Sequence, residues 1–299
     1  MEVTLGARGV ALGVVGAAAT GAVVAILLGA AGGGWFRRWS SWAVGGGEHR
    51  PRAKWRLPSR IILLRHGQSL GNVKESAYRV IPDWQIPLTE HGKMQARLAA
   101  AKIVEMIGDE QVVIYYSPYT RVLQTLDPLL EAVPPGQLLS VQEEPRIREQ
   151  DFGNYQDSSM KDIKKERVRF GRFFYRFPEG ESVADVYDRI SSFFETIFRQ
   201  FKRSPICNLP PEKDFALVIV SHGITLRLFI MRWFLWTVKD FEKMKNPPNC
   251  HPITLVRRDN KGHHYEMDHE SQGRLGVTST MPSTGQYQLP LHYTPHWYS

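Results

Sequence analysis

The chain has 299 residues, enough for one large domain or two small ones with a sizeable core. Its 42% hydrophobic and 23% charged residues are ordinary for a globular protein, and its two cysteines, Cys207 and Cys250, stand in neither a disulfide nor a zinc-site pattern. Residues 1–60 hold eight basic and two acidic residues, so +6 of the net charge of +8 belongs to this segment. The charge balance therefore argues against a nucleic-acid-binding body.

The first 39 residues form an apolar N-terminal segment, in which Gly9–Phe36 carry no charge over 28 residues. This length can span a bilayer. Arg37 and Arg38 follow it, so the positive-inside rule predicts a membrane anchor with the folded domain facing the cytoplasm. A cleaved targeting signal for an organelle and an unstructured head of a soluble cytoplasmic protein are the alternatives.

Residues 40–59 are rich in Gly, Pro and basic residues without apolar periodicity, which predicts a linker. We expect the folded domain to span residues 60–258 and a disordered tail to span 259–299. Strand and helix patterns alternate in the domain, and this predicts a three-layer α/β/α sandwich with a mainly parallel sheet. The expected strands are 61–64, 112–116, 138–141, 216–220 and a late edge strand at 253–256. One expected helix begins after the N-cap Thr89, and its apolar stripe is Met94, Leu98, Ala101, Ile103, Met106 and Ile107. Further helices are expected at 119–131, 183–201 and 224–236.

Two of the buried strands end in the same pair of residues, His66-Gly67 and His222-Gly223. Ligands bind just past the carboxyl ends of strands in such sheets, so the two imidazoles can meet at one rim. Arg65 precedes the first pair, and Arg121 lies shortly after the second strand. Two cations beside two imidazoles suit a phosphoryl group, and the cations favour a neutral, nucleophilic histidine. A carboxyl group is still needed to protonate the departing oxygen, and Glu149 is the candidate.

The segment Lys161–Arg176 has seven basic residues against Asp162 and Glu166. A solvated helix face explains such a run, and a basic rim that attracts anionic substrates is the alternative. Nucleic-acid binding is disfavoured because no recognition motif accompanies the run.

Four segments together resemble the motifs of the histidine phosphatase superfamily, which includes the cofactor-dependent phosphoglycerate mutases. They occur in the family's order and are Leu64–Asn72, Ser117–Thr125, Arg148–Gly153 and Val220–Gly223. The stretch Arg148–Arg189 is most similar to plant and fungal phosphoglycerate-mutase-like proteins, some of which act as broad acid phosphatases.

The resemblance implies a role for each matching residue. His66 would accept the phosphoryl group as a phosphohistidine, and Glu149 would protonate the leaving oxygen and then activate water; Asp151 is a neighbouring candidate for this acid. The phosphoryl oxygens would be held by Arg65, Ser69, Asn72, Arg121, His222 and the backbone near Gly223. No metal or other cofactor is expected, and the expected partner is a phosphorylated small-molecule substrate.

Two departures from the mutase pattern favour a phosphatase over a mutase. Phe152 stands where the mutases have a Tyr, and Ile224 stands where they have an Asn. Both changes remove polar contacts to the substrate. A mutase-type phosphoryl transfer and a catalytically silent, phosphate-dependent scaffold remain the alternatives. Specificity would come from residues 73–87 and 158–178.

Overall fold

A computed structural model describes residues 56–153, 160–258, 264–277 and 284–286. The predicted anchor at residues 9–36 and most of the predicted linker lie outside these ranges. Among the helices within them, none combines the length and the apolar composition needed to cross a bilayer.

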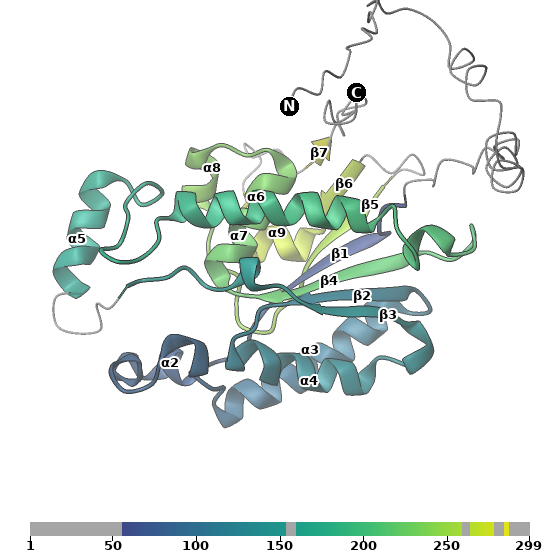
Figure 1. Ribbon diagram of the computed structural model, residues 1–299, viewed down its shortest axis with the longest axis horizontal. Coiled ribbons are helices and arrows are strands. Elements are labelled where there is room, and N and C mark those ends of the chain that lie inside the picture. Colours follow the sequence, from purple (N-terminus) through teal and green to yellow (C-terminus); the bar gives the residue numbers. More distant parts are fainter. Residues whose placement is uncertain (1–55, 154–159, 259–263, 278–283, 287–299) are drawn as a thin grey trace, which may run out of the picture. The chain divides into compact units, whose positions relative to one another are not determined.

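The centre of the fold is a seven-stranded sheet with the order β3-β2-β4-β1-β5-β6-β7 (Figure 1). The first four strands in this order run parallel, and the remaining pairings are antiparallel. The strands are β1 (Arg60–Arg65), β2 (Gln111–Tyr116), β3 (Leu138–Glu143), β4 (Phe215–Ser221), β5 (Ile253–Arg257), β6 (His264–Met267) and β7 (Thr284–Gln286).

The register of β1 against β4 sets the position of the two His-Gly pairs. Leu64 lies opposite Val220, and Arg65 lies opposite Ser221. His66 and His222 therefore leave neighbouring parallel strands at the same level, as the duplicated strand ends predict.

Helices cover both faces of the sheet, as Figure 1 shows. The helices α3 (Glu90–Ile107) and α4 (Thr120–Ala132) pack with Ile62, Leu64 and Ile114 on one face. The helices α6 (Val183–Gln200) and α7 (Gly223–Phe234) pack with residues such as Ile61 and Leu63 on the other. Successive strand residues point to opposite faces, so the fully aliphatic strands bury both. The three-layer α/β/α sandwich is confirmed.

Helix α3 begins as predicted, and its predicted apolar stripe is confirmed in part. Thr89 is its N-cap, and the hydroxyl of Thr89 accepts a hydrogen bond from the Gly92 N–H at 3.0 Å. The predicted stripe residues Ile103 and Ile107 are buried, whereas Met94 and Leu98 are 57% and 67% exposed. The buried stripe consists largely of small residues, Ala96, Ala99, Ala100, Ile103 and Ile107. Small side chains let α3 pack closely against α4, and the predicted stripe left out Ala96, Ala99 and Ala100.

The C-terminal boundary predicted at residue 258 is too early. Strand β5 is not an edge strand, because it pairs with both β1 and β6. Strand β6 is followed by the helix α9 (His269–Leu275), and Tyr265, Met267 and Leu275 are buried in the core. The polar composition beyond Asn260 concealed these alternating buried residues.

The segments expected to set specificity contain short elements at the strand ends where the histidines lie. Residues 73–87 form two short 3₁₀ turns, at Glu75–Arg79 and at Asp83–Gln85, after the helix α2 (Leu70–Val73). The second segment holds the helix α5 (Met160–Phe170), which includes much of the basic run. A further short helix, α8 (Val238–Lys243), follows α7.

Candidate active site

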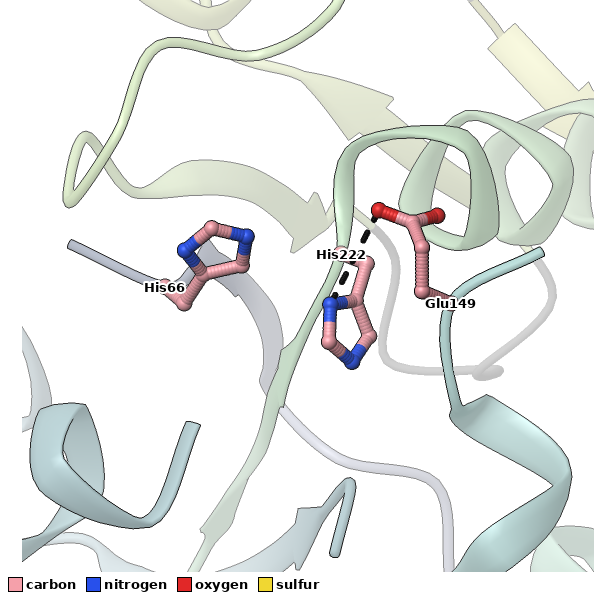
Figure 2. A group of neighbouring side chains, drawn as sticks. All are labelled: His66, Glu149 and His222. Carbon is pink, nitrogen blue, oxygen red and sulfur yellow. Dashed lines mark ion pairs between the residues drawn. The ribbon is translucent and has the colours of Figure 1, made fainter. Parts of the chain in front are cut away.

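The structure brings the two strand-end histidines and the predicted acid together. The ring centres of His66 and His222 lie 5.3 Å apart, and both residues are at most 2% exposed. Glu149 follows a 3₁₀ turn at Pro145–Ile147, and its Oε2 lies 3.8 Å from Nδ1 of His222. Figure 2 shows these three side chains arriving from three separate parts of the chain.

The hydrogen bond of His66 defines which of its nitrogens can react. Nδ1 lies 2.7 Å from the carbonyl oxygen of Gly67. A carbonyl oxygen only accepts hydrogen bonds, so Nδ1 carries the proton in this contact. In the neutral ring, Nε2 then keeps its lone pair. The lone pair on Nε2 of His66 is therefore not used by the Gly67 contact.

The surroundings keep both imidazoles neutral. Burial, followed by the positive charge of Arg121, holds the pKa of His66 and the pKa of His222 well below their ordinary values. The charge of Arg65 acts in the same direction on both. Both imidazoles consequently resist protonation more strongly than an exposed histidine does.

His222 is held through its second nitrogen. Its Nε2 lies 2.8 Å from Oγ of Ser117, the first residue after β2. Its Nδ1 is buried and has no hydrogen-bond partner among the described residues. If the Ser117 hydroxyl donates to Nε2, then Nδ1 bears the ring proton and can donate to an anion. Buried donors without a partner are rare in folded proteins and point to a ligand.

Arg65 and Arg121 provide permanent positive charge beside the imidazoles. Arg121 is only 2% exposed, and its guanidinium carbon lies 4.9 Å from the ring centre of Tyr119. Arg65 donates from Nη1 to the carbonyl of Pro247 at 3.0 Å, and its buried Nε has no partner within the described residues. An oxyanion between the two guanidinium groups would satisfy these donors.

The loop that carries Glu149 is tied down on several sides by side chains. Arg189 of α6 donates to the carbonyls of Arg148 and Glu149, both at 3.0 Å. Ser221, at the end of β4, donates to the carbonyl of Ile147 at 2.6 Å. Glu181 in turn accepts hydrogen bonds from Arg189 and from Arg148. These bonds fix the backbone from which Glu149 reaches the histidines.

The two neighbouring acids in this loop have different surroundings. The side chain of Glu149 is 15% exposed, and burial raises its pKa above the ordinary value, although the charge of Arg121 acts against the shift. Asp151 is exposed, and its Oδ1 accepts a hydrogen bond from the Gly153 N–H at 2.8 Å. Glu149 lies against His222, and its raised pKa suits a proton donor.

The other predicted binding residues lie nearby with different partners. Gly223 is the first residue of α7, directly after His222. Ser69 is fully buried, and Asn72 is exposed. The side-chain oxygen of Asn72 accepts a hydrogen bond from the Ser69 N–H at 3.0 Å. Asn72 thus stabilises the turn after β1, and only its amide nitrogen remains for a substrate.

Gly67 has a packing role that the sequence did not indicate. A side chain at this position would place its Cβ 2.5 Å from the carbonyl oxygen of Gly92 on α3. The glycine therefore permits a close approach between the end of β1 and α3.

One group of described side chains could in principle hold a metal ion. His66, Glu149 and His222 each offer one ligand atom, and these atoms lie within 4.8 Å of one another. The positive charges of Arg65 and Arg121 beside these residues would repel a metal cation. The expectation that no metal is needed stays a prediction.

Comparisons with known proteins agree with this geometry. The family model of the histidine phosphatase superfamily (branch 1) matches residues 61–267. The chain belongs to the histidine phosphatase superfamily. This match extends through β6, beyond the predicted end of the domain, and membership identifies the chain as an enzyme of the phosphatase class.

Individual members of the superfamily are similar over most of their length. The phosphoglycerate mutase-like protein AT74H of Arabidopsis thaliana is 48% identical over 204 residues, which cover 65% of this chain and 72% of AT74H. The broad-range acid phosphatase DET1 of Saccharomyces cerevisiae is 32% identical, over 64% of this chain and 83% of DET1.

Solved structures support the fold independently. A mycobacterial glucosyl-3-phosphoglycerate phosphatase superposes with a TM-score of 0.56 at 23% identity, and the match covers 71% of this chain and 97% of that protein. At this identity the likeness bears on the fold alone.

Several residues that support the site carry no signal in the sequence pattern. Arg189 lies in the middle of a helix, and Asp83 lies in an irregular segment beside Pro82, so neither has a local signal. Asn249 donates from its side chain to the carbonyl of His66 at 2.7 Å across 183 positions of sequence. Ser117 opens the second family motif, which could have identified it.

Proposed function

We propose that the chain is a phosphomonoester hydrolase that works through a phosphohistidine on His66. The observation that carries this proposal is the Nδ1 contact of His66 with the Gly67 carbonyl at 2.7 Å, which leaves Nε2 as the reactive atom. The low pKa of His66, caused by burial and then by Arg121, keeps that atom unprotonated.

In the first step, Nε2 of His66 attacks phosphorus and the ester P–O bond breaks. Glu149 gives its proton to the departing alkoxide, so a neutral alcohol leaves. Arg65, Arg121 and the Nδ1 proton of His222 hold the three phosphoryl oxygens, on which the negative charge of the transition state spreads.

In the second step, water attacks the phosphorus of the phosphohistidine. The Glu149 carboxylate takes a proton from this water, the P–N bond breaks, and inorganic phosphate leaves. His66 returns to its neutral form and Glu149 to its protonated form. The same carboxyl group thus acts as acid and then as base.

Hydrolysis is favoured over mutase-type transfer by the contacts of Phe152 and Ile224. The ring of Phe152 lies 5.0 Å from that of Phe177, and Ile224 packs against the core, so each position makes apolar contacts. A mutase needs polar contacts to hold a phosphorylated acid in two orientations.

The proposal is tested with the full chain and two reactions. We expect turnover of 4-nitrophenyl phosphate that is lost in His66→Ala. With 3-phosphoglycerate and a bisphosphoglycerate primer, we expect free phosphate to accumulate. Accumulation of 2-phosphoglycerate would instead identify a mutase, and inactivity toward all phosphomonoesters across pH would favour a phosphate-dependent scaffold.

A further inference from the structure

Asp83 lies directly against a guanidinium group that we assign to the phosphoryl oxygens. Nη1 of Arg121 donates to the backbone carbonyl of Asp83 at 2.6 Å, and it lies 3.0 Å from Oδ1 of the Asp83 carboxylate. Within the described residues, Nε and Nη2 of Arg121 donate to no protein acceptor. Asp83 therefore fixes one end of the guanidinium and leaves its other donors for a phosphoryl group.

Contacts and charge link Asp83 to Glu149, on the side from which the alcohol leaves in the proposed reaction. Glu149 protonates the leaving oxygen in the proposed reaction, so the alcohol portion of the substrate lies near Glu149. A chain of contacts joins the two acids: Arg121 lies over Tyr119, the ring of Tyr119 lies 5.0 Å from that of His222, and His222 lies against Glu149.

Electrostatics support this placement. Burial raises the pKa of Tyr119 to about 12 and also raises the pKa of Glu149, and the negative charge of Asp83 adds to both shifts. The charge of Asp83 thus reaches the acid that protonates the leaving group.

The cations on the Glu149 side are already paired. Arg148 donates to Glu181 at 2.6 Å, and Arg189 donates to both carboxylate oxygens of Glu181 at 3.0 Å. A second anionic group on the substrate would therefore meet the Asp83 carboxylate rather than an unpaired cation from Arg148 or Arg189.

We propose that the Asp83 carboxylate determines the substrate class: phosphomonoesters with a neutral or cationic alcohol portion are accepted, and those with a second anionic group beside the phosphate are disfavoured. This inference rests on the proposed function, because it uses Glu149 to define the leaving-group side. The cause is repulsion between like charges in a partly buried site, where water screens it only weakly. Asp83 itself has an exposed fraction of 27%, so the effect is moderate.

The test uses two substrates that differ in a single group. Glycerol 2-phosphate carries a CH₂OH group where 2-phosphoglycerate carries a carboxylate. We expect kcat/KM of the full chain to be about tenfold higher for glycerol 2-phosphate. The substitution Asp83→Asn keeps the size of the side chain and the backbone contact to Arg121, and it should bring the ratio of the two kcat/KM values close to one.

A matched control removes a charge from the same segment. Glu75 lies on the exposed 3₁₀ turn at Glu75–Arg79, and Glu75→Gln should leave the ratio as in the unsubstituted chain. The inference is overturned if Asp83→Asn leaves the ratio unchanged, if Glu75→Gln changes it equally, or if the unsubstituted chain prefers 2-phosphoglycerate.

A binding measurement separates this inference from the proposed function. Calorimetry gives the affinities of the same two compounds for His66→Asn, with and without Asp83→Asn, and needs no turnover. A chain that hydrolyses neither compound nor 4-nitrophenyl phosphate contradicts the proposed function. The ratio of affinities then still decides the role of Asp83: a ratio that Asp83→Asn reduces supports it, and an unchanged ratio overturns it.

Discussion

The floor of the candidate site, formed by His66 and His222, is built differently from its wall, formed by Asp83 and Glu149. The floor residues follow directly from paired strands, so the register of β1 and β4 fixes their positions. The wall residues come from loops and short turns, and side chain–backbone hydrogen bonds from Arg121 and Arg189 hold them. The sheet thus positions the group that we propose reacts with phosphorus, while side chains from other segments position the groups that face the alcohol. Changes to the floor should abolish the reaction, and changes to the wall should tune it.

The largest expected effect is that of the nucleophile. His66→Asn should lower kcat/KM for 4-nitrophenyl phosphate by at least about 10³-fold, because no other described group presents a free imidazole lone pair at the same place. Steady-state kinetics measure this loss. His91→Asn, at an exposed position on α3, is the control and should retain full activity. Substantial activity in His66→Asn would contradict the role of His66 as the nucleophile.

The proton donor should matter only when the leaving group is poor. Glu149→Gln should lower kcat by about 10²-fold for glycerol 2-phosphate, and by far less for 4-nitrophenyl phosphate, whose phenolate leaves without a proton. A comparison of kcat for the two substrates measures this dependence. Asp151→Asn is the matched control in the same loop, and an equal loss for both substrates in Glu149→Gln would argue against proton donation.

Loosening the loop that carries Glu149 should change the pH dependence of kcat. Arg189→Lys keeps the charge but cannot make all the hydrogen bonds of the guanidinium to the loop carbonyls. We expect kcat to fall about tenfold and the alkaline limb of the pH profile to move to lower pH, because a more solvated Glu149 has a lower pKa.

A change on the same helix provides the control for Arg189. Arg199→Lys lies near the exposed end of α6 and should leave both kcat and the pH profile unchanged. A fall in kcat without any shift of the alkaline limb would mean that Arg189 supports the fold and does not position Glu149.

The smallest effect concerns the dependence of stability on pH. Burial lowers the pKa of His66 and of His222, so below about pH 6.5 the unfolded chain binds protons that the folded chain does not. The free energy of unfolding should therefore decrease as the pH is lowered below about 6.5, by up to about 1.4 kcal/mol per pH unit for each imidazole. Urea unfolding from pH 6.5 to 5 should show a shallower slope in His222→Asn but not in the exposed control His269→Gln.

The sequence predicted the floor better than the wall, for physical reasons. Aliphatic runs that end in His-Gly define buried parallel strands and the residues at their ends, so local pattern was sufficient for His66 and His222. The partners of Glu149 and Arg121 come from distant, irregular or helical segments, as with Asp83 and Arg189. No local periodicity encodes such contacts. The same limit applies to β6 and α9, whose few buried residues lie within a polar stretch.

The most direct test of the account asks which nitrogen carries the phosphoryl group. The full chain is mixed with a phosphomonoester and quenched in alkali, and the phosphorylated residue is located by mass spectrometry and its nitrogen by phosphorus–nitrogen NMR. The account predicts Nε2-phosphohistidine at residue 66, because Nδ1 is committed to the Gly67 carbonyl. A phosphoryl group on Nδ1 of His66, or on His222, would contradict it.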